Sequence, residues 1–189
     1  MKQAPVLSER EKQRIMHHVQ RTSYAARNRC MLMLSWLAGM RVGEIAALDV
    51  GDIVGPDGAI RHEIQLRADQ TKGDKARKVL VNSQLQAELD RYVKTFNQLL
   101  DPKRPFIASK TGKRFSPNGL CQRFLQLYDE AGMDKATSHS GRRTFITNLA
   151  HKGVNVRVLA ALSGHRNIST TQRYIEVNDN ILREAVELA

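Results

Sequence analysis

Apolar residues recur at helical spacing along most of this chain, and polar residues suited to capping mark where several helices begin. Ser8-Glu9-Arg10-Glu11 has capping-box spacing and predicts a first helix that ends near Gln20. A second, largely buried helix is expected over residues 23–37, because Gly39 stands just past its last apolar positions. A short helix over residues 41–48 should follow.

The pattern changes to that of strands and turns between residues 52 and 81. Gly55-Pro56-Asp57-Gly58 predicts a turn. Residues 60–66 then alternate apolar with polar side chains, and residues 78–81 are rich in β-formers. The segment 71–75 lies between these two runs, so we expect a small antiparallel hairpin with this segment at its turn.

Helical patterns resume after the hairpin, and Ser116-Pro117 supplies the N-cap and first helical position of one of them. The remaining expected elements are helices over residues 82–99, 117–130, 140–152, 155–162, 169–176 and 179–188, a short strand over 106–108 and a basic turn over 110–113. Together these elements predict one mainly α domain with a small antiparallel β-sheet, an α+β fold that spans residues 1–189.

Basic residues outnumber acidic ones by a wide margin. The chain has 30 Lys and Arg against 19 Asp and Glu, which gives a formal net charge of +11 at pH 7. A positive field of this size favours a polyanionic partner, and nucleic acid is the commonest one. A role in solubility or a ribosome-like environment would also explain the charge, so charge alone does not choose between them.

The two cysteines, Cys30 and Cys121, are far apart and form no C-x-x-C pair, so we expect free thiols in a reducing cytoplasm. No signal-peptide pattern precedes the first helix. The longest apolar run, residues 30–40, is too short to span a bilayer. These features predict a soluble cytoplasmic protein with no membrane partner, associated with the nucleoid if its partner is DNA.

Two motifs near the C-terminus carry the candidate chemistry. They are His139-Ser140-Gly141-Arg142 and Gly164-His165, the latter nine residues before Tyr174. Far upstream stands Arg41, with Glu44 three residues later as its expected ion-pair partner. Two arginines can neutralise a phosphodiester, histidines can move or hold protons, and a tyrosine can act as the nucleophile. The set therefore outlines a site that cuts phosphodiesters.

In this order, these residues resemble the catalytic domain of the tyrosine recombinase (phage integrase) family. The family pattern runs Arg, Lys in a β-hairpin, His-x-x-Arg, His or Trp, and then Tyr, and it is matched here by Arg41, Lys72, His139, Arg142, His165 and Tyr174. The resemblance extends from about Pro5 to the C-terminus and implies the catalytic-domain fold of that family.

The resemblance implies an enzyme that exchanges DNA strands through a 3′-phosphotyrosyl intermediate, with Tyr174 as the nucleophile. Arg41 and Arg142 would donate paired N–H groups to the non-bridging oxygens, a geometry that lysine cannot reproduce. His139 would accept the tyrosine proton or hold the phosphate, and His165 would hydrogen-bond a non-bridging oxygen and buttress the tyrosine. The simpler interpretations are a core tyrosine, a solvated helix arginine and structural histidines.

The resemblance assigns the general acid for the leaving 5′-oxygen to Lys72, which precedes a Gly-Asp turn. Lys75 in the same turn is the alternative, and a solvated basic loop is the interpretation without function. Other basic residues near these motifs are expected to contact DNA: Lys75, Lys110, Lys113, Arg114, Arg143 and Arg166. No metal or nucleotide cofactor is implied, and the sequence contains neither a P-loop nor a carboxylate cluster suited to Mg²⁺.

Three positions depart from the usual residues of the family. Gly141 and Ser163 stand where leucine is common, and Arg143 stands where histidine is frequent. These departures affect local packing more than catalytic groups. A further departure is that only about seven residues precede the first predicted helix, where most members carry a core-binding domain. The chain is either a naturally short member, like the fimbrial phase-switch recombinases, or an excised domain.

The resemblance also implies a partner and an assembly: double-stranded DNA, bound by a homotetramer on two sites. The tail 177–189 would pack on a neighbouring protomer or fold back on its own. Two other functions stay open. A type IB topoisomerase shares the chemistry, but the small size argues against it, and a DNA-binding regulator could keep the fold without cutting.

Overall fold

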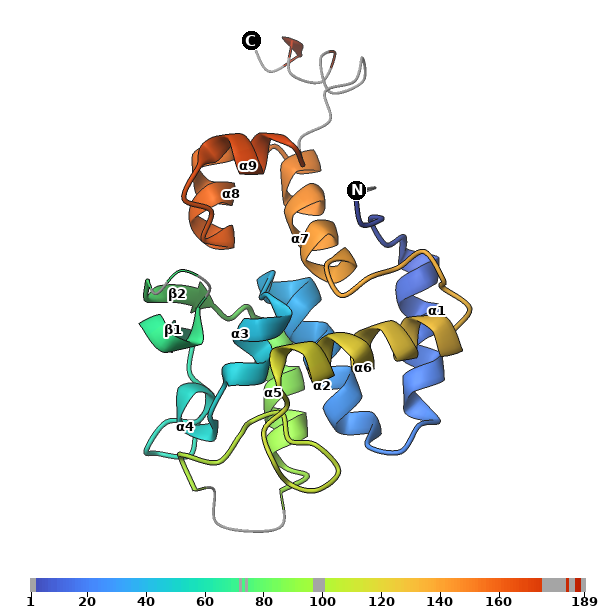
Figure 1. Cartoon of the computed structure of the whole chain (residues 1–189). Helices are drawn as coiled ribbons and strands as arrows, with labels where there is room; N and C mark the ends of the chain where they lie inside the picture. Colours follow the sequence, from blue (N-terminus) through green and yellow to red (C-terminus); the bar gives the residue numbers. More distant parts are fainter. Residues whose placement is uncertain are drawn as a thin grey trace.

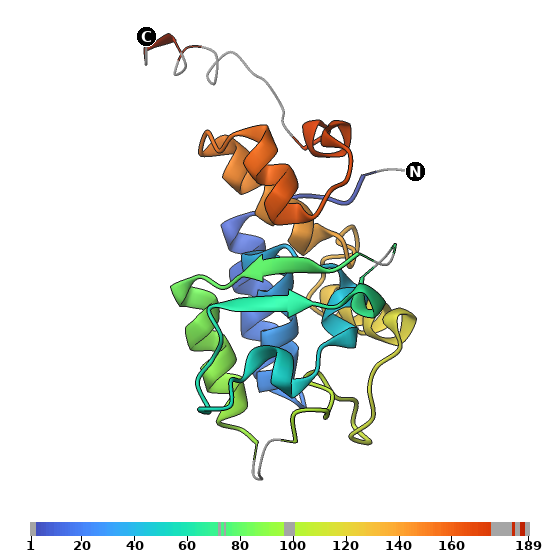
Figure 2. The same ribbon diagram turned by 90° about the vertical axis from the view of Figure 1, so that its left-hand side faces the viewer.

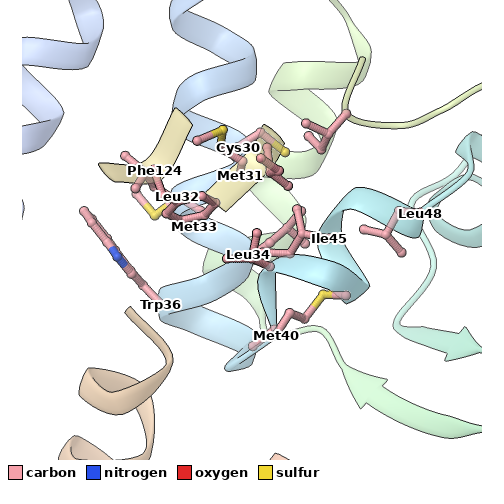
Figure 3. Packing of buried hydrophobic residues seen from close by; sticks show 14 of the residues in the cluster. Cys30, Met31, Leu32, Met33, Leu34, Trp36, Met40, Ile45, Leu48 and Phe124 are labelled. Atoms are coloured by element: carbon pink, nitrogen blue, oxygen red, sulfur yellow. The ribbon is translucent and has the colours of Figure 1, made fainter. Parts of the chain in front are cut away.

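Helix α2 (Ala25–Ala38) runs through the middle of the molecule and is buried on nearly all sides. The computed structural model describes residues 3–71, 73, 75–96, 101–174, 183, 186 and 187. In this part of the chain, α2 contacts helices from both the N-terminal and the C-terminal halves. Its run Cys30-Met31-Leu32-Met33-Leu34 is apolar on every face, as expected of a core helix. Figure 3 shows Leu34 beside Ile45 and Met40 in this core.

Helix α1 (Glu9–Gln20) begins with the predicted capping box, in which Ser8 and Glu11 cap each other's backbone N–H groups. Gly39 ends α2 in the left-handed conformation, with φ of 59°. A Cβ atom at Gly39 would lie 2.5 Å from the ring of Phe145, so both the backbone angle and the close approach favour glycine. The chain then enters the short helix α3 (Val42–Ala47), whose N-cap residue is Arg41.

The sheet consists of strands β1 (Glu63–Leu66) and β2 (Arg77–Leu80), antiparallel, with Ile64 opposite Val79. Its buried face packs on the core, and α8 lies along the edge formed by β2 (Figure 2). The first strand is shorter than predicted because Ile60 pairs with Val54 in an isolated bridge instead. Helix α4 (Val50–Ile53) and the 3₁₀ turn η1 (Ala68–Gln70) were not predicted.

Helix α5 (Ser83–Val93) is tied to α2 by a two-bond ion pair between Glu88 and Arg29, with N···O distances of 2.6 and 2.7 Å. It ends earlier than predicted, in a turn over residues 94–96, and residues 97–100 are not described. Helix α6 (Pro117–Glu130) matches its prediction because Ser116 caps it and Pro117 fits its first position. Residues 106–108 form no strand; Pro105, just before them, and Ala108 each form an isolated bridge.

Helices α7 (Ser140–His151), α8 (Val156–Ser163) and α9 (Ile168–Gln172) form a layer over the C-terminal end of α2 (Figure 1). Helix α9 is shorter than predicted, and Tyr174 lies in the turn after it. The predicted helix over 179–188 and the proposed exchange of the tail fall almost entirely outside the described residues, so both stay predictions. The fold class, mainly α with a two-stranded antiparallel sheet, is confirmed.

Among the described residues, no helix combines the length and apolar character needed to cross a membrane. Both cysteines are free thiols, as predicted. Cys30 is fully buried, which raises the pKa of its thiol well above the usual range, and Cys121 is half-buried.

Candidate functional site

Arg142 is the most deeply placed of the predicted catalytic residues that the structure describes, with only 4% of its surface exposed. It lies in the first turn of α7, and its guanidinium donates to the backbone carbonyls of Gly39 and Ser163. Burial, and then the neighbouring charge of Arg41, lower the pKa of Arg142 to about 9. The side chain is therefore still protonated at neutral pH, and two of its five N–H groups are used to hold it in place.

Gly141, one of the departures from the family pattern, allows this placement. A Cβ atom here would lie 2.3 Å from the indole of Trp36 and 2.5 Å from the hydroxyl of Ser35. Helix α7 thus approaches α2 so closely that only glycine fits. Where the family usually has leucine, this chain replaces side-chain packing with direct contact between helix backbone and Trp36.

Arg41 and Glu44 pair as predicted. The Arg41 backbone N–H donates to Glu44 Oε2 at 2.8 Å, and its Nη1 donates to Oε1 at 2.8 Å. Burial of Glu44, only 1% exposed, would raise the pKa of its carboxyl group, but hydrogen bonds and charges from Arg77 and Arg41 outweigh this effect and lower it. Arg41 is 27% exposed, so its guanidinium is open to a ligand.

Arg77 on β2 is a second arginine at this carboxylate, and the sequence motifs did not point to it. Its Nε and Nη2 donate to the two oxygens of Glu44 at 3.0 and 2.7 Å. A signal was available: Arg77 shares a strand face with Val79, and side chains two apart on a strand point the same way. An arginine on the buried face of a strand requires a partner.

The C-terminus of α8 holds all three arginines. The last carbonyl groups of a helix have no partner within it. Here, three consecutive ones each accept a hydrogen bond from one guanidinium, and the pairs are Leu162 with Arg77 at 3.1 Å, Ser163 with Arg142 at 2.6 Å and Gly164 with Arg41 at 3.3 Å. The negative end of the helix dipole thus faces a cluster of positive charge.

His165 directly follows these carbonyls. Its Nδ1 lies 2.9 Å from the buried hydroxyl of Thr171 on α9. Burial, followed by the charges of Arg142, Arg41 and Arg77, lowers the pKa of His165 to about 4. The imidazole is therefore neutral at physiological pH.

Tyr174 lies against His165, with the two rings stacked at a centroid distance of 5.8 Å and an angle of 22°. The guanidinium of Arg143 lies over the Tyr174 ring, 5.7 Å from its centroid. Arg143 also donates to the side chain of Gln3. The phenol ring thus contacts both a neutral imidazole and a cation.

His139 is the N-cap residue of α7 and is exposed. It lines an open pocket of about 610 Å³ together with four other predicted catalytic residues. The pocket is lined by Gln3, Ala4, Arg41, Thr137, His139, Arg142, Arg143, His165, Thr170, Arg173 and Tyr174. Five residues separated by up to 133 positions in the sequence therefore meet at one surface.

The sixth predicted catalytic residue, Lys72, lies outside the described residues and stays a prediction. On either side of it, Thr71 bonds the backbone of Lys75 and the carbonyl of Gly73 accepts from Arg166. The side chain of Arg166 thus links the hairpin turn to the segment after His165. Lys75 is exposed.

The lining of this pocket does not include three other basic residues predicted to contact DNA: Lys110, Lys113 and Arg114. Lys110 lines a separate pocket with Tyr24, at the N-terminal end of α2. Helix α2 is about 20 Å long at 1.5 Å per residue, so this end is far from Arg41. Arg114 donates to the carbonyls of Ala46 and Leu48 and to Asp49. Their role in DNA binding, like that of Lys113, stays a prediction.

The sequence matches the profile of the phage integrase family over residues 5–180. The chain belongs to the phage integrase family. It is 30% identical over 165 residues to the tyrosine recombinase XerA of Pyrococcus horikoshii, covering 86% of this chain and 55% of that protein. It is also 30% identical over 171 residues to the tyrosine recombinase XerC of Vibrio campbellii, covering 87% and 51%. The chain thus spans about half the length of these relatives.

Solved structures agree on the fold of this phage integrase family member. A crystal structure of XerA recombinase superimposes with a TM-score of 0.76 at 24% identity, over 99% of this chain and 66% of that one. A lambda integrase dimer bound to a core site gives a TM-score of 0.69 at 18% identity, over 93% and 60%. The resemblance inferred from the motif residues is therefore confirmed for both family and fold.

Proposed function

We propose that this chain is the catalytic part of a site-specific DNA recombinase that cuts and rejoins DNA without metal or nucleotide. The observation that carries the proposal is the single pocket in which Arg41, His139, Arg142, His165 and Tyr174 meet. Phosphoryl transfer needs a positioned nucleophile and preorganised positive charge, and this pocket supplies both.

In the proposed reaction, the phenol oxygen of Tyr174 attacks the scissile phosphorus and its proton passes to His139. The bond from phosphorus to the 5′-oxygen breaks, and Lys72 protonates that oxygen. The product is a 3′-phosphotyrosyl bond and a free 5′-hydroxyl. The phosphotyrosyl bond is a phosphodiester like the one broken, so a second 5′-hydroxyl can reverse the step and join a new strand.

The neutral state of His165 gives it a specific part in this proposal. In the tautomer in which Thr171 donates to Nδ1, the imidazole carries its N–H on Nε2. That N–H can donate to a non-bridging oxygen. With a pKa of about 4, His165 is unsuited to be the general acid. We assign that role to Lys72 from the family resemblance, with Lys75 as the alternative.

Double-stranded DNA is the proposed partner, and a homotetramer on two sites is the proposed working unit, in the cytoplasm at the nucleoid. The net charge of +11 and the open, basic pocket support a DNA substrate. Structural relatives include a XerH recombinase bound to its difH substrate and the lambda integrase dimer on a core site. Exchange of the tail 177–189 between protomers is part of the same proposal.

The test is adduct formation on a nicked suicide duplex carrying candidate sites from the DNA that flanks the gene. The wild type should form a covalent protein–DNA adduct that survives a denaturing gel, and Tyr174→Phe should form none. Tyr24→Phe is the matched control, because Tyr24 is exposed at the far end of α2 and should leave the adduct unchanged.

Other outcomes separate the remaining functions. Clear DNA binding without an adduct on any site would favour a non-cutting regulator. Relaxation of supercoiled plasmid by monomers, without exchange between two sites, would favour a topoisomerase. Sedimentation of the protein with its duplex would show whether tetramers form.

A further inference from the structure

We propose that Arg77 is a positioning residue that leaves the charge of Arg41 available to the scissile phosphate by taking over the Glu44 carboxylate. The inference rests on the proposed function and adds a residue to it. Arg77 touches no part of the pocket lining, so its effect passes through Glu44 and through the end of α8.

The geometry favours Arg77 over Arg41 as the main partner of Glu44. Arg77 binds both carboxylate oxygens through a two-bond fork, the strongest arrangement open to this pair. Arg41 reaches the same carboxylate with one guanidinium nitrogen, Nη1, and it is the more exposed of the two arginines. The Glu44 charge is thus shared, and the larger share goes to Arg77, which does not line the pocket.

The sum of the charges on the three arginines and Glu44 shows why the pairing of Arg77 with Glu44 matters. A lone Arg41–Glu44 pair would be neutral and would offer little positive charge to the phosphate. With Arg77 included, two guanidinium groups face one carboxylate, and Arg142 adds a third positive charge. Attack by a phenolate on a phosphodiester monoanion creates a transition state with two negative charges. Three arginines and one glutamate leave two positive charges to meet it.

Arg77 also fixes the backbone that holds the other two arginines. Its Nη1 donates to the carbonyl of Leu162, and its Cδ lies 2.7 Å from the position of a Cβ at Gly164. Gly164 is in the left-handed conformation with φ of 62°, which favours glycine, and its carbonyl accepts from Arg41. Arg77 therefore packs directly under the turn that leads into His165.

The experiment compares wild type with Arg77→Gln, Arg77→Lys and the control Lys78→Gln. Lys78 is the next residue on β2, points to solvent and pairs only with exposed Glu63 among the contacts described, so its substitution removes the same charge without touching Glu44. Single-turnover adduct formation and DNA affinity are measured separately on a nicked duplex. Circular dichroism confirms that each variant is folded.

Arg77→Gln should slow adduct formation by about a hundredfold while DNA affinity changes by less than about threefold. Arg77→Lys keeps the charge but loses the fork, so it should slow the step by about tenfold. Lys78→Gln should stay within about threefold of wild type.

A neutral scissile group separates charge positioning from support of the fold. In a duplex with a methylphosphonate at the cut site, one non-bridging oxygen becomes a methyl group and the transition state carries one negative charge fewer. On this duplex, Arg77→Gln should form the adduct less than about tenfold more slowly than wild type. An equal deficit on both duplexes, or a wild-type rate on the normal one, would overturn the inference.

Orthovanadate binding gives a readout that needs no cutting. Arg77→Gln should bind this phosphate-like anion about tenfold more weakly than wild type and Lys78→Gln, as measured by calorimetry. If the wild type forms no adduct, the recombinase assignment fails, but the vanadate comparison still decides the role of Arg77. Equal vanadate affinity in wild type and Arg77→Gln, or no binding by either, would refute that role.

Discussion

Two arginine–carboxylate clusters lie close together in the sequence, one at Glu44 within α3 and one at Asp49 just after it. Glu44 pairs with Arg41 and Arg77, and Arg142 adds a third positive charge nearby. Around Asp49, the ratio is reversed. Arg67 pairs with Asp49 at 3.0 Å, Asp52 at 2.9 Å and Asp69 at 3.4 Å, and Arg114 pairs with Asp49 as well.

The comparison of these clusters shows which arginines of this chain keep uncancelled positive charge. At Asp49, two arginines meet three carboxylates, their charge is cancelled, and they tie α4, η1 and the loop before α6 together. At Glu44, positive charge is left over beside an open pocket. The ratio of arginines to acids therefore distinguishes the cluster that we propose to be reactive from the structural one.

The strongest test of this comparison is the pair Arg142→Lys and Arg114→Lys. Lysine at position 142 keeps a positive charge but cannot bridge the carbonyls of Gly39 and Ser163, so adduct formation should slow by about 10²–10³-fold. Arg114→Lys should change the rate by less than about threefold, because its partners are structural. Single-turnover gel assays measure both, and comparable losses in the two variants would contradict the distinction.

Removing one carboxylate should lower the free energy of unfolding by a different amount in each cluster. Glu44→Gln leaves neighbouring guanidinium groups without their buried carboxylate and should lower the free energy of unfolding by about 3–5 kcal/mol. Asp69→Asn removes an acid that is 73% exposed, and its cost should stay below about 0.5 kcal/mol. Urea denaturation followed by circular dichroism gives both values. A small cost for Glu44→Gln would mean that the cluster relaxes without its acid.

A smaller effect is expected for Arg143, the cation over the Tyr174 ring. Arg143→Gln should slow adduct formation by about fivefold, because a cation–π contact of this kind contributes about 1 kcal/mol. Arg157→Gln is the control for lost charge, since Arg157 is exposed on α8. If both variants slow the reaction equally, the effect comes from the general field of the protein.

A pH dependence of stability is also expected, because burial, and then the charges of the neighbouring arginines, keep His165 neutral. In the folded protein its pKa is about 4, and in the unfolded chain a histidine titrates near its usual 6.5. Between these values, the unfolded state binds more protons, so the free energy of unfolding should fall as the pH falls from 6.5 towards 4. His165→Gln lacks this contribution and should show a shallower decline in urea midpoints between pH 7 and pH 5. Identical slopes would show that His165 titrates normally.

Sequence reasoning succeeded where a local signal decides the structure. Ser8 and Ser116 mark helix starts through their own side chains, and α1 and α6 begin as predicted. The family motif likewise named five residues that the structure gathers in one pocket. Their roles in cutting stay predictions.

The failures come from contacts between distant segments. Arg77 has no motif of its own, and only the fold brings it to Glu44, 33 residues earlier. The sequence likewise did not show that Arg114 donates to Asp49 and to carbonyls of the α3 region, and its predicted DNA contact stays a prediction. Helix α5 ends early because residues 94–96 turn, which its apolar pattern did not indicate.

The three carbonyl groups at the end of α8 belong to the backbone, so no particular amino acid encodes them. Outward-facing residues of this helix, such as Val158 and Ala161, can therefore be substituted without disturbing the arginines. A change in the length of the helix has a different effect. Inserting or deleting one residue in α8 would rotate the carbonyls by about 100° and displace every guanidinium at once. The number of residues in α8, more than their identity, thus sets where the three arginines are held.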